Sequence, residues 1–171
     1  MFHVIKLELT FRDGLYATNP CKILYKDDDD QLIQLTKFRC TRTGDVALHA
    51  CQFKSMLCDA AYRLKIMRVR AAIKKDLHLQ QAFTPIQYVE LDTHKFYGQR
   101  NTVGQRFIFL NEHMFVSDAK LDIELKLFDR SPFTLGMFRD CLMFGQELGL
   151  GGLRIREEGK FDAVITDISE V

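Results

Sequence analysis

The sequence predicts an α+β protein in which one antiparallel sheet carries two helices on one of its faces. Three observations predict it: stretches in which apolar and polar residues alternate, two stretches with an apolar stripe at helical spacing, and the order in which these stretches follow one another. The chain has 171 residues, 47% of them hydrophobic, which is enough for one domain without disulfides or a structural metal. We expect that domain to span residues 1–171, with insertions at about residues 15–48 and 67–85.

The first strand is expected at Ile5–Phe11, where apolar residues alternate with charged residues and threonine. In the insertion that follows, Lys22–Tyr25 and Leu32–Phe38 are candidates for short strands. They flank Asp27–Asp30, which lacks the spaced ligands of a calcium-binding loop and is interpreted as a solvated turn rather than a cation site.

Two helices are expected from the spacing of apolar residues. The first covers Cys51–Leu64, where apolar residues recur at intervals of three and four. The second covers Pro132–Leu148. Ser131 is its expected N-cap, Pro132 suits the first helical position, and Gly149 suits the position just after the helix.

Three more strands complete the order of elements. Arg106–Leu110 and Leu121–Leu127 lie between the two helices, and Lys160–Ile165 follows the second helix. Without the insertions the order is strand, helix, strand, strand, helix, strand. This is the split order of a ferredoxin-like domain, βαββαβ, in which both helices cover one face of an antiparallel sheet and the other face is left for a partner.

A glycine-rich loop separates the second helix from the last strand. It reads Gly149-Leu-Gly-Gly-Leu-Arg-Ile-Arg-Glu-Glu-Gly-Lys-Phe161. Glycines permit positive φ and close approach, and bare N–H groups together with arginines suit phosphate oxygens. The candidate contact residues of the loop are Gly149, Gly151, Gly152, Arg154, Arg156 and Gly159. The alternative interpretation is a long helix C-cap followed by a hairpin-like turn.

In this order of elements the loop resembles that of the RAMP superfamily, the CRISPR-associated RNA-binding proteins. Their loop reads roughly glycine, hydrophobic residue, glycine, a few residues that often include basic ones, then glycine, any residue, glycine. The corresponding residues here are Gly149-Leu150-Gly151 and Gly159-Lys160-Phe161. Residues 121–164 and 47–64 also resemble parts of small uncharacterised phage proteins.

The resemblance covers about half of the chain and has two departures. Phe161 stands where the superfamily has its last glycine, and there is no clear second ferredoxin-like domain. Both features matter in the processing nucleases of the superfamily. The resemblance therefore implies a surface for RNA or single strands on the glycine-rich loop, and not an activity.

Gly98–Arg106 is a second candidate contact region. It places two glycines and the arginines Arg100 and Arg106 at a hairpin-like tip just after Phe96-Tyr97, which combines rings for base stacking with side chains for phosphate. The alternative is an ordinary exposed hairpin.

The basic residues are concentrated although the formal net charge is only +1. The stretch Lys37–Lys75 holds ten Lys and Arg residues against Asp45 and Asp59. Such a field is a candidate polyanion surface, and it adds Arg63 and Arg70 to the candidate nucleic-acid contacts. The alternative is a solvated helix face.

A catalytic or metal site has little support in the sequence. The histidines lie apart and form no known metal-ligand motif, so we expect no metal and no cofactor. His49, just before the first helix, is a weak candidate for a general base in metal-free RNA cleavage. A contact at the helix N-terminus or a plain surface histidine is the alternative, and we expect a binding protein rather than an enzyme.

The cysteines and the apolar runs indicate the compartment. The cysteines are odd in number and lack the C-x-x-C spacing of zinc sites, so reduced, unpaired thiols are expected. They are Cys21, Cys40, Cys51, Cys58 and Cys141. No apolar run is long enough to cross a bilayer and no signal peptide is recognised, which predicts a cytoplasmic protein without a membrane partner.

Two functions stay open. The first is a nucleic-acid-binding module of phage or CRISPR-related origin, with RNA or single strands and the subunits of a ribonucleoprotein as partners. The second is a protein-interaction module, or an inhibitor that docks on a host defence complex without touching nucleic acid.

Overall fold

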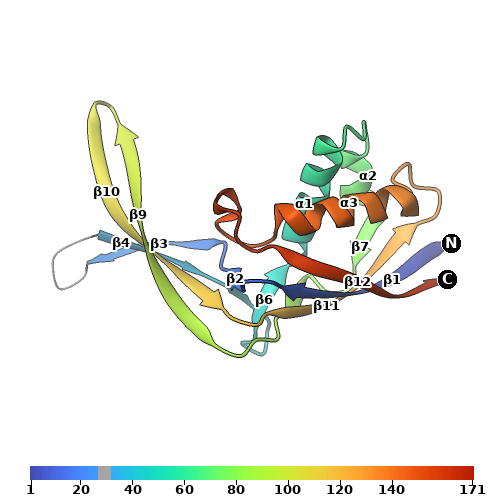
Figure 1. Ribbon diagram of the computed structural model, residues 1–171, viewed down its shortest axis with the longest axis horizontal. Helices are drawn as coiled ribbons and strands as arrows, with labels where there is room; N and C mark the ends of the chain where they lie inside the picture. The colour runs from blue at the N-terminus through green and yellow to red at the C-terminus, as the bar shows by residue number, and fades with distance from the viewer. Residues whose placement is uncertain (27–31) are drawn as a thin grey trace.

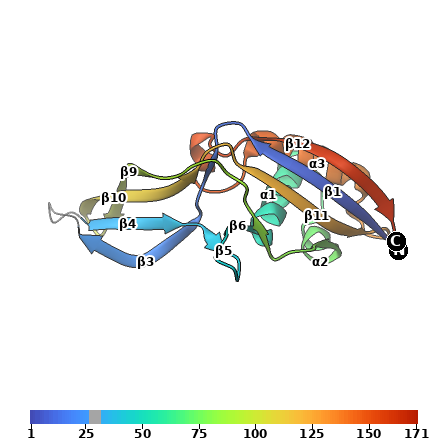
Figure 2. The same ribbon diagram turned by 90° about the horizontal axis from the view of Figure 1, so that it is seen from below.

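The computed structural model describes residues 1–26 and 32–171, with side chains at these positions except 20–26, 32, 98–102, 105–109 and 155. The predicted turn at Asp27–Asp30 therefore lies outside the described residues. The fold is α+β: a ferredoxin-like sheet covered by helices continues into a second, more extended sheet. Figures 1 and 2 show these two parts lying next to each other along the long axis of the molecule.

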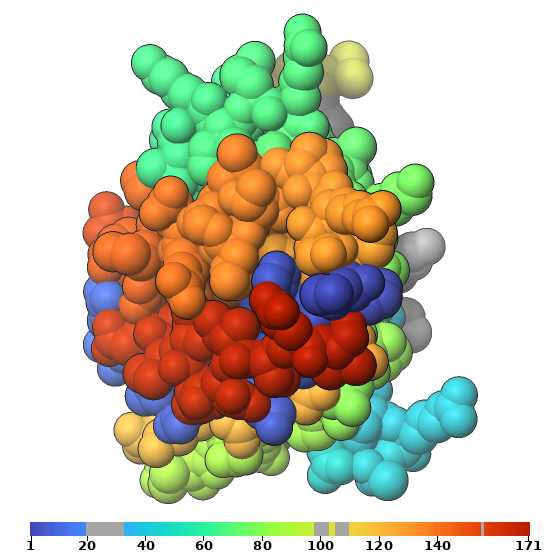
Figure 3. Space-filling model, turned by 90° about the vertical axis from the view of Figure 1, so that its right-hand side faces the viewer, coloured from blue at the N-terminus to red at the C-terminus, as the bar shows by residue number. Residues whose placement is uncertain are grey.

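The ferredoxin-like sheet is antiparallel throughout and has the strand order β12-β1-β11-β7. Its strands are β1 (Phe2–Phe11), β7 (Leu77–Leu79), β11 (Lys120–Phe128) and β12 (Phe161–Glu170). The register matches the alternation of apolar residues along the strands. Leu7, for example, lies opposite both Ile123 of β11 and Ile165 of β12. The chain ends meet where Phe2 and Val171 exchange backbone hydrogen bonds of 2.7 and 3.0 Å (Figure 3).

The helices α1 (Ala50–Arg63), α2 (Arg70–Asp76) and α3 (Leu135–Leu148) lie on one face of this sheet (Figure 1), which confirms the predicted placement. Their apolar stripes face the sheet, and Phe53 and Phe138 are fully buried. α1 and α3 pack so closely at Gly145 that a Cβ there would collide with the side chain of Met56, and the absence of a side chain at Gly145 permits this approach.

The start of α3 differs from the prediction. Thr134 is the N-cap, with its hydroxyl accepting a 3.3 Å hydrogen bond from the N–H of Met137. Ser131 instead closes the preceding turn, because its hydroxyl accepts from the N–H of Phe133 and donates to Asp76 of α2. The helix ends at Leu148, and Gly149 follows with a φ of 77°, as predicted.

The assignment of Arg106–Leu110 to the ferredoxin-like sheet was wrong. These residues belong to β10 of the second sheet, and β7 takes their place beside β11. β7 has only three residues, too few to show a period of two, and it lies within the stretch 67–85 that was expected to be an insertion. The order βαββαβ itself is confirmed.

The second sheet is built around a long hairpin. Its strands are β2 (Leu15–Tyr16), β3 (Asn19–Lys26), β4 (Leu32–Lys37), β9 (Leu91–Thr102) and β10 (Gln105–Val116). β9 and β10 pair over their whole length and turn at Val103-Gly104, both at positive φ, as a two-residue hairpin requires. The other edge of β10 pairs with β2 and, in parallel, with β4.

A small third sheet joins the two parts. It has the order β5-β6-β8, with β5 (Arg39–Cys40), β6 (Val46–His49) and β8 (Phe83–Pro85). β6 runs directly into α1. The strands predicted at Lys22–Tyr25 and Leu32–Phe38 thus correspond to β3 and β4.

Candidate nucleic-acid interface

The glycine-rich loop from Gly149 to Lys160 stands between α3 and β12, beside the second sheet (Figure 1). It closes on itself through a 2.9 Å hydrogen bond from the N–H of Leu150 to the carbonyl of Gly159. The buried side chain of Leu150 anchors it in the core. Residues 154–156 form a short 3₁₀ turn, η1 (Arg154–Arg156), in which Arg156 is exposed and Arg154 is half-buried.

The glycines of this loop are required by its internal packing. Gly149, Gly151 and Gly159 have φ values of 77°, 79° and 75°, which side chains with a Cβ rarely adopt. A Cβ at Gly151 would lie 2.5 Å from Leu15 Cδ1 and 2.6 Å from the carbonyl of Tyr16. The N–H of Gly152 donates to that same carbonyl over 2.8 Å. The glycines therefore shape the loop against the residues around β2, and the positive charge is carried by its arginines.

The two arginines of η1 reach different elements. Arg154 Nη2 lies 2.7 Å from Asp59 Oδ2 of α1, an ion pair in which both side chains are partly exposed. Arg156 lies over the ring of Phe96 on β9, with its guanidinium carbon 4.9 Å from the ring centroid. An ion pair thus connects the loop to α1, and a cation–π contact connects it to β9 of the hairpin.

Phe96 belongs to an aromatic cluster of which the sequence indicates only a part. The cluster consists of Tyr16, His94, Phe96, His113 and Phe115. His94 stacks on Phe115 at 4.6 Å, and the hydroxyl of Tyr16 lies 2.7 Å from Nδ1 of His94. The signal in the sequence is the two-residue spacing of aromatic side chains on both β9 and β10, but the pairing of His94 with His113 depends on the hairpin register.

Burial shifts the titration of two members of this cluster. Burial lowers the pKa of His113 below its ordinary value, and the charge of Arg156 lowers it further, against a hydrogen bond with the backbone of Ala17. Burial also raises the pKa of Tyr16, with Glu158 acting in the same direction. Both side chains are therefore uncharged at neutral pH, so His113 does not repel the guanidinium of Arg156.

Pockets on the helix side are joined by shared residues into a cationic path. The loop pocket, of about 500 Å³, is lined by Gly151, Leu153, Arg154 and Arg156. The helix pocket, of about 470 Å³, is lined by Asp59, Tyr62, Arg63, Leu148 and Arg154. The α1–α2 pocket, of about 430 Å³, is lined by Cys51, Lys54, Ser55, Cys58, Asp59, Arg70 and Lys74. Arg154 joins the first two and Asp59 the last two.

The other predicted contacts have different outcomes. Arg63 and Arg70 are exposed and lie on the cationic path. Arg100 and Arg106 lie on β9 and β10, near the tip of the hairpin, and their side chains are not among those described. His49 is the N-cap of α1: its Nδ1 accepts a 3.1 Å hydrogen bond from the N–H of Cys51. The helix-contact alternative for His49 is therefore confirmed.

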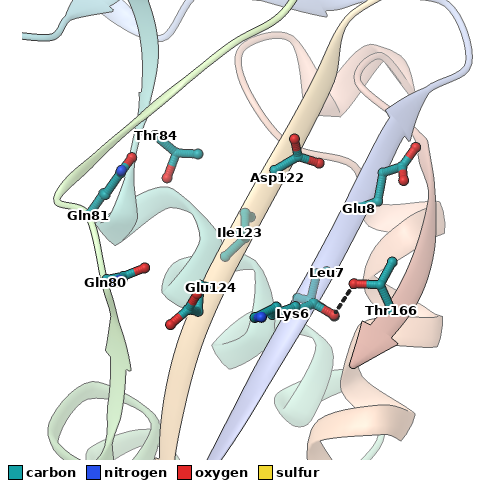
Figure 4. Close-up of a pocket in the computed structure, with 10 residues that line it drawn as sticks. All are labelled: Lys6, Leu7, Glu8, Gln80, Gln81, Thr84, Asp122, Ile123, Glu124 and Thr166. Atoms are coloured by element: carbon teal, nitrogen blue, oxygen red, sulfur yellow. Dashed lines mark hydrogen bonds between the residues drawn. The ribbon is translucent and has the colours of Figure 1, made fainter. Parts of the chain in front are cut away.

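The open face of the ferredoxin-like sheet has the opposite charge. Its pocket of about 390 Å³, the sheet pocket, is shown in Figure 4. The charged residues of its lining are Lys6, Glu8, Asp122 and Glu124. The ammonium of Lys6 already lies 3.7 Å from a carboxylate oxygen of Asp167. Three carboxylates against one neutralised lysine make this pocket unfavourable for a polyanion.

The described residues contain neither a cluster of metal ligands nor a membrane-spanning helix. In this part of the chain, no group of three or more His, Cys, Asp or Glu residues is placed to hold a metal ion, and no helix is long and apolar enough to cross a membrane. Cys40, Cys51, Cys58 and Cys141 are free thiols, and the side chain of Cys21 is not among those described.

Comparison with known proteins identifies the fold. No family model and no curated protein matches the chain. A chain of the type III-B Cmr-beta complex, a structure with bound cognate target RNA, matches 98% of this chain with a TM-score of 0.62 and 9% identity. A chain of a type IV-B CRISPR complex matches 95% of it with a TM-score of 0.52 and 11% identity, over 90% of its own length.

These likenesses bear on the fold alone, because the identities are low. This chain spans 60% of the length of the Cmr-beta chain. The structural neighbours are thus subunits of CRISPR complexes, and the α+β, ferredoxin-like fold that the resemblance to the RAMP superfamily implied is the fold of this protein.

Proposed function

We propose that this RAMP-like protein, of CRISPR-related or phage origin, binds RNA or another single-stranded nucleic acid through its glycine-rich loop. The observation that carries the proposal is the position of Arg156, which lies over Phe96 at the junction of the loop and the hairpin. One place thus offers a cation for the phosphate and aromatic rings for the bases, the combination that single-strand binding uses.

The surroundings of Arg156 support the same ligand. Tyr97, the neighbour of Phe96 on β9, is 71% exposed. Successive side chains of a strand alternate between its faces, so Tyr97 adds an accessible ring on the face of the hairpin opposite to Phe96. Arg154 and the cations of the helix side extend the positive surface beyond the loop pocket. The loop glycines let the loop pack tightly against the residues around β2, and this packing positions Arg154 and Arg156.

The structural neighbours add support of a general kind. The Cmr-beta structure contains RNA, and both neighbours are subunits of CRISPR complexes. A single strand and neighbouring protein subunits are therefore the partners that we propose for this protein.

Fluorescence anisotropy with single- and double-stranded RNA and DNA at a series of salt concentrations tests the proposal. We expect binding of single strands that weakens linearly on a log–log plot against salt. The Arg154→Ala, Arg156→Ala double variant should flatten that slope by about 0.7 unit for each phosphate that the arginines no longer neutralise. The Arg139→Ala, Lys75→Ala double variant, which removes two positive charges at exposed positions of α3 and α2 outside the pockets, is the matched control. Single-strand binding that the double variant leaves unchanged contradicts the loop as the interface.

A protein-interaction function is the second candidate, and an apolar pocket favours it. The pocket, of about 500 Å³, is lined by Leu64, Ile66, Asp140, Met143, Phe144 and Glu147, and Met143 is 68% exposed. Such surfaces on proteins often contact other proteins. Two results together would favour this function over the first. The wild-type protein would bind none of the four nucleic acids, and a Met143→Asp variant would lose a protein partner that the wild type retains in a pull-down.

A further inference from the structure

The α1–α2 pocket is a site of uncompensated positive charge. Lys54 comes from α1, and Arg70 and Lys74 come from the facing side of α2. In the part of the chain that the structure describes, none of these three residues has a carboxylate within ion-pair distance. The carboxylate of the pocket, Asp59, is engaged by Arg154 at 2.7 Å.

Lys54 is held in the wall of this pocket and is partly removed from water. Its ammonium donates a 3.0 Å hydrogen bond to the backbone carbonyl of Lys74. Burial lowers the pKa of Lys54, against a smaller opposing effect of Cys58. A bound anion would favour the charged form of this partly desolvated ammonium.

The chemistry of the lining indicates which anion fits. The pocket offers a guanidinium, two ammonium groups and the hydroxyl of Ser55, all of which are donors. A phosphate group has oxygens in several directions and suits such a set. The pocket also continues through Asp59 and the helix pocket to the loop pocket.

We propose that the α1–α2 pocket binds a phosphate group of the nucleic-acid strand whose neighbouring nucleotides lie on the glycine-rich loop. This inference rests on the proposed function and extends it: the strand passes from the hairpin and the loop along α1 to α2. The phosphate is either an internal diester or the terminal monoester of the strand, and both have the oxygens that the pocket requires.

A charge-matched pair of double variants tests the pocket. Arg70→Gln with Lys74→Gln removes two pocket cations, and Arg139→Gln with Lys75→Gln removes the same charges from exposed positions outside the pockets. For single-stranded RNA that is long enough to span the path, we expect the pocket variant to bind about tenfold more weakly, with a salt slope shallower by about 0.7 unit. The control variant should bind like the wild type, and thermal melting shows whether both are folded.

A second measurement uses the wild-type protein and so does not depend on a variant. Cys51 and Cys58 line the α1–α2 pocket, whereas Cys40 is exposed on β5. Single-stranded RNA should slow the alkylation of Cys51 and Cys58, measured by mass spectrometry of peptides, and leave Cys40 unchanged. Strands with a 5′-phosphate, a 3′-phosphate or neither separate the two sources, because only a terminal site depends on the end group.

The outcomes separate this inference from the proposed function. If RNA binds and the loop variants weaken it, but the pocket variant matches its control and Cys51 and Cys58 stay unprotected, the pocket inference is overturned and the proposed function stands. If the wild-type protein binds no single strand, both are overturned. Protection of both thiols together with the loss of affinity supports the pocket.

Discussion

The sheet pocket and the α1–α2 pocket have similar volumes, about 390 and 430 Å³, and opposite charges. The sheet pocket presents carboxylates on the open face of the ferredoxin-like sheet, and the α1–α2 pocket presents cations on the helix side. A formal net charge of +1 conceals this separation. The size of a pocket therefore does not indicate its ligand here, whereas the sign of the charge that lines it does.

The register of the sheet explains the acidic side. Glu8 of β1 lies directly opposite Asp122 of β11, so that two like charges are neighbours on the same face. The next pair along, Lys6 and Glu124, is of opposite sign. On the helix side, by contrast, the positive side chains come from different elements, and α1, α2 and the glycine-rich loop have to pack before they meet.

Gly159→Ala is expected to have the largest effect, because it should destabilise the glycine-rich loop that carries part of the cationic path. The added Cβ would collide with the backbone carbonyl of Leu150, and φ at this position is +75°. We expect the free energy of unfolding to fall by about 2–4 kcal/mol, measured by urea denaturation. Gly44→Ala is the control, because φ there is +89° but nothing lies within 4 Å, and it should cost about 1 kcal/mol. Equal costs at the two positions would show that the loop can move away.

The next effect separates the two arginines of η1. Arg156→Ala should weaken single-strand binding by about tenfold, the loss of one charge-assisted hydrogen bond. Arg154→Ala should weaken it less, because Asp59 already offsets much of the charge of Arg154. Anisotropy titrations of both variants at one salt concentration measure the difference. A larger loss for Arg154→Ala would place the strand nearer α1 than the hairpin.

A pair of isosteric changes tests the comparison of the two pockets directly. Asp59→Asn removes a negative charge from the cationic path and should raise single-strand affinity by about threefold, the size of a surface charge interaction. Asp122→Asn removes the same charge from the sheet pocket and should leave the affinity unchanged. Both are measured as dissociation constants at low salt. A gain for Asp122→Asn would mean that the strand also approaches the open face of the sheet.

Local patterns in the sequence predicted the elements of the fold better than their pairing. Strong periodicity located β1, β11, α1 and α3, and glycines at positive φ were correctly placed after α3. β7 was missed because three residues carry no periodic signal, and β10 was placed in the wrong sheet because strand partners are not encoded locally. The register between strands of one hairpin depends on its turn, here Val103-Gly104.

The residues of the candidate site likewise fall into those that local sequence patterns indicate and those that only tertiary packing brings together. The loop and its arginines lie in one short run of sequence, so the sequence could propose them as candidates. The Arg154–Asp59 pair joins residues 95 positions apart, and Tyr16 enters the aromatic cluster from the two-residue strand β2. Contacts of this kind arise from tertiary packing, and single-sequence patterns do not contain them.

The smallest expected effect concerns the aromatic cluster beside the loop and the pH dependence of stability. Burial lowers the pKa of His113 in the folded protein below the ordinary value of 6.5. The unfolded chain therefore binds the proton more readily, so the free energy of unfolding falls as the pH drops from the unfolded pKa toward the folded one, and this contribution is complete above the unfolded pKa. His113→Asn should remove that part of the pH dependence. Urea denaturation of both proteins between neutral and mildly acidic pH measures it, and parallel curves would mean that His113 is as solvated as a free histidine.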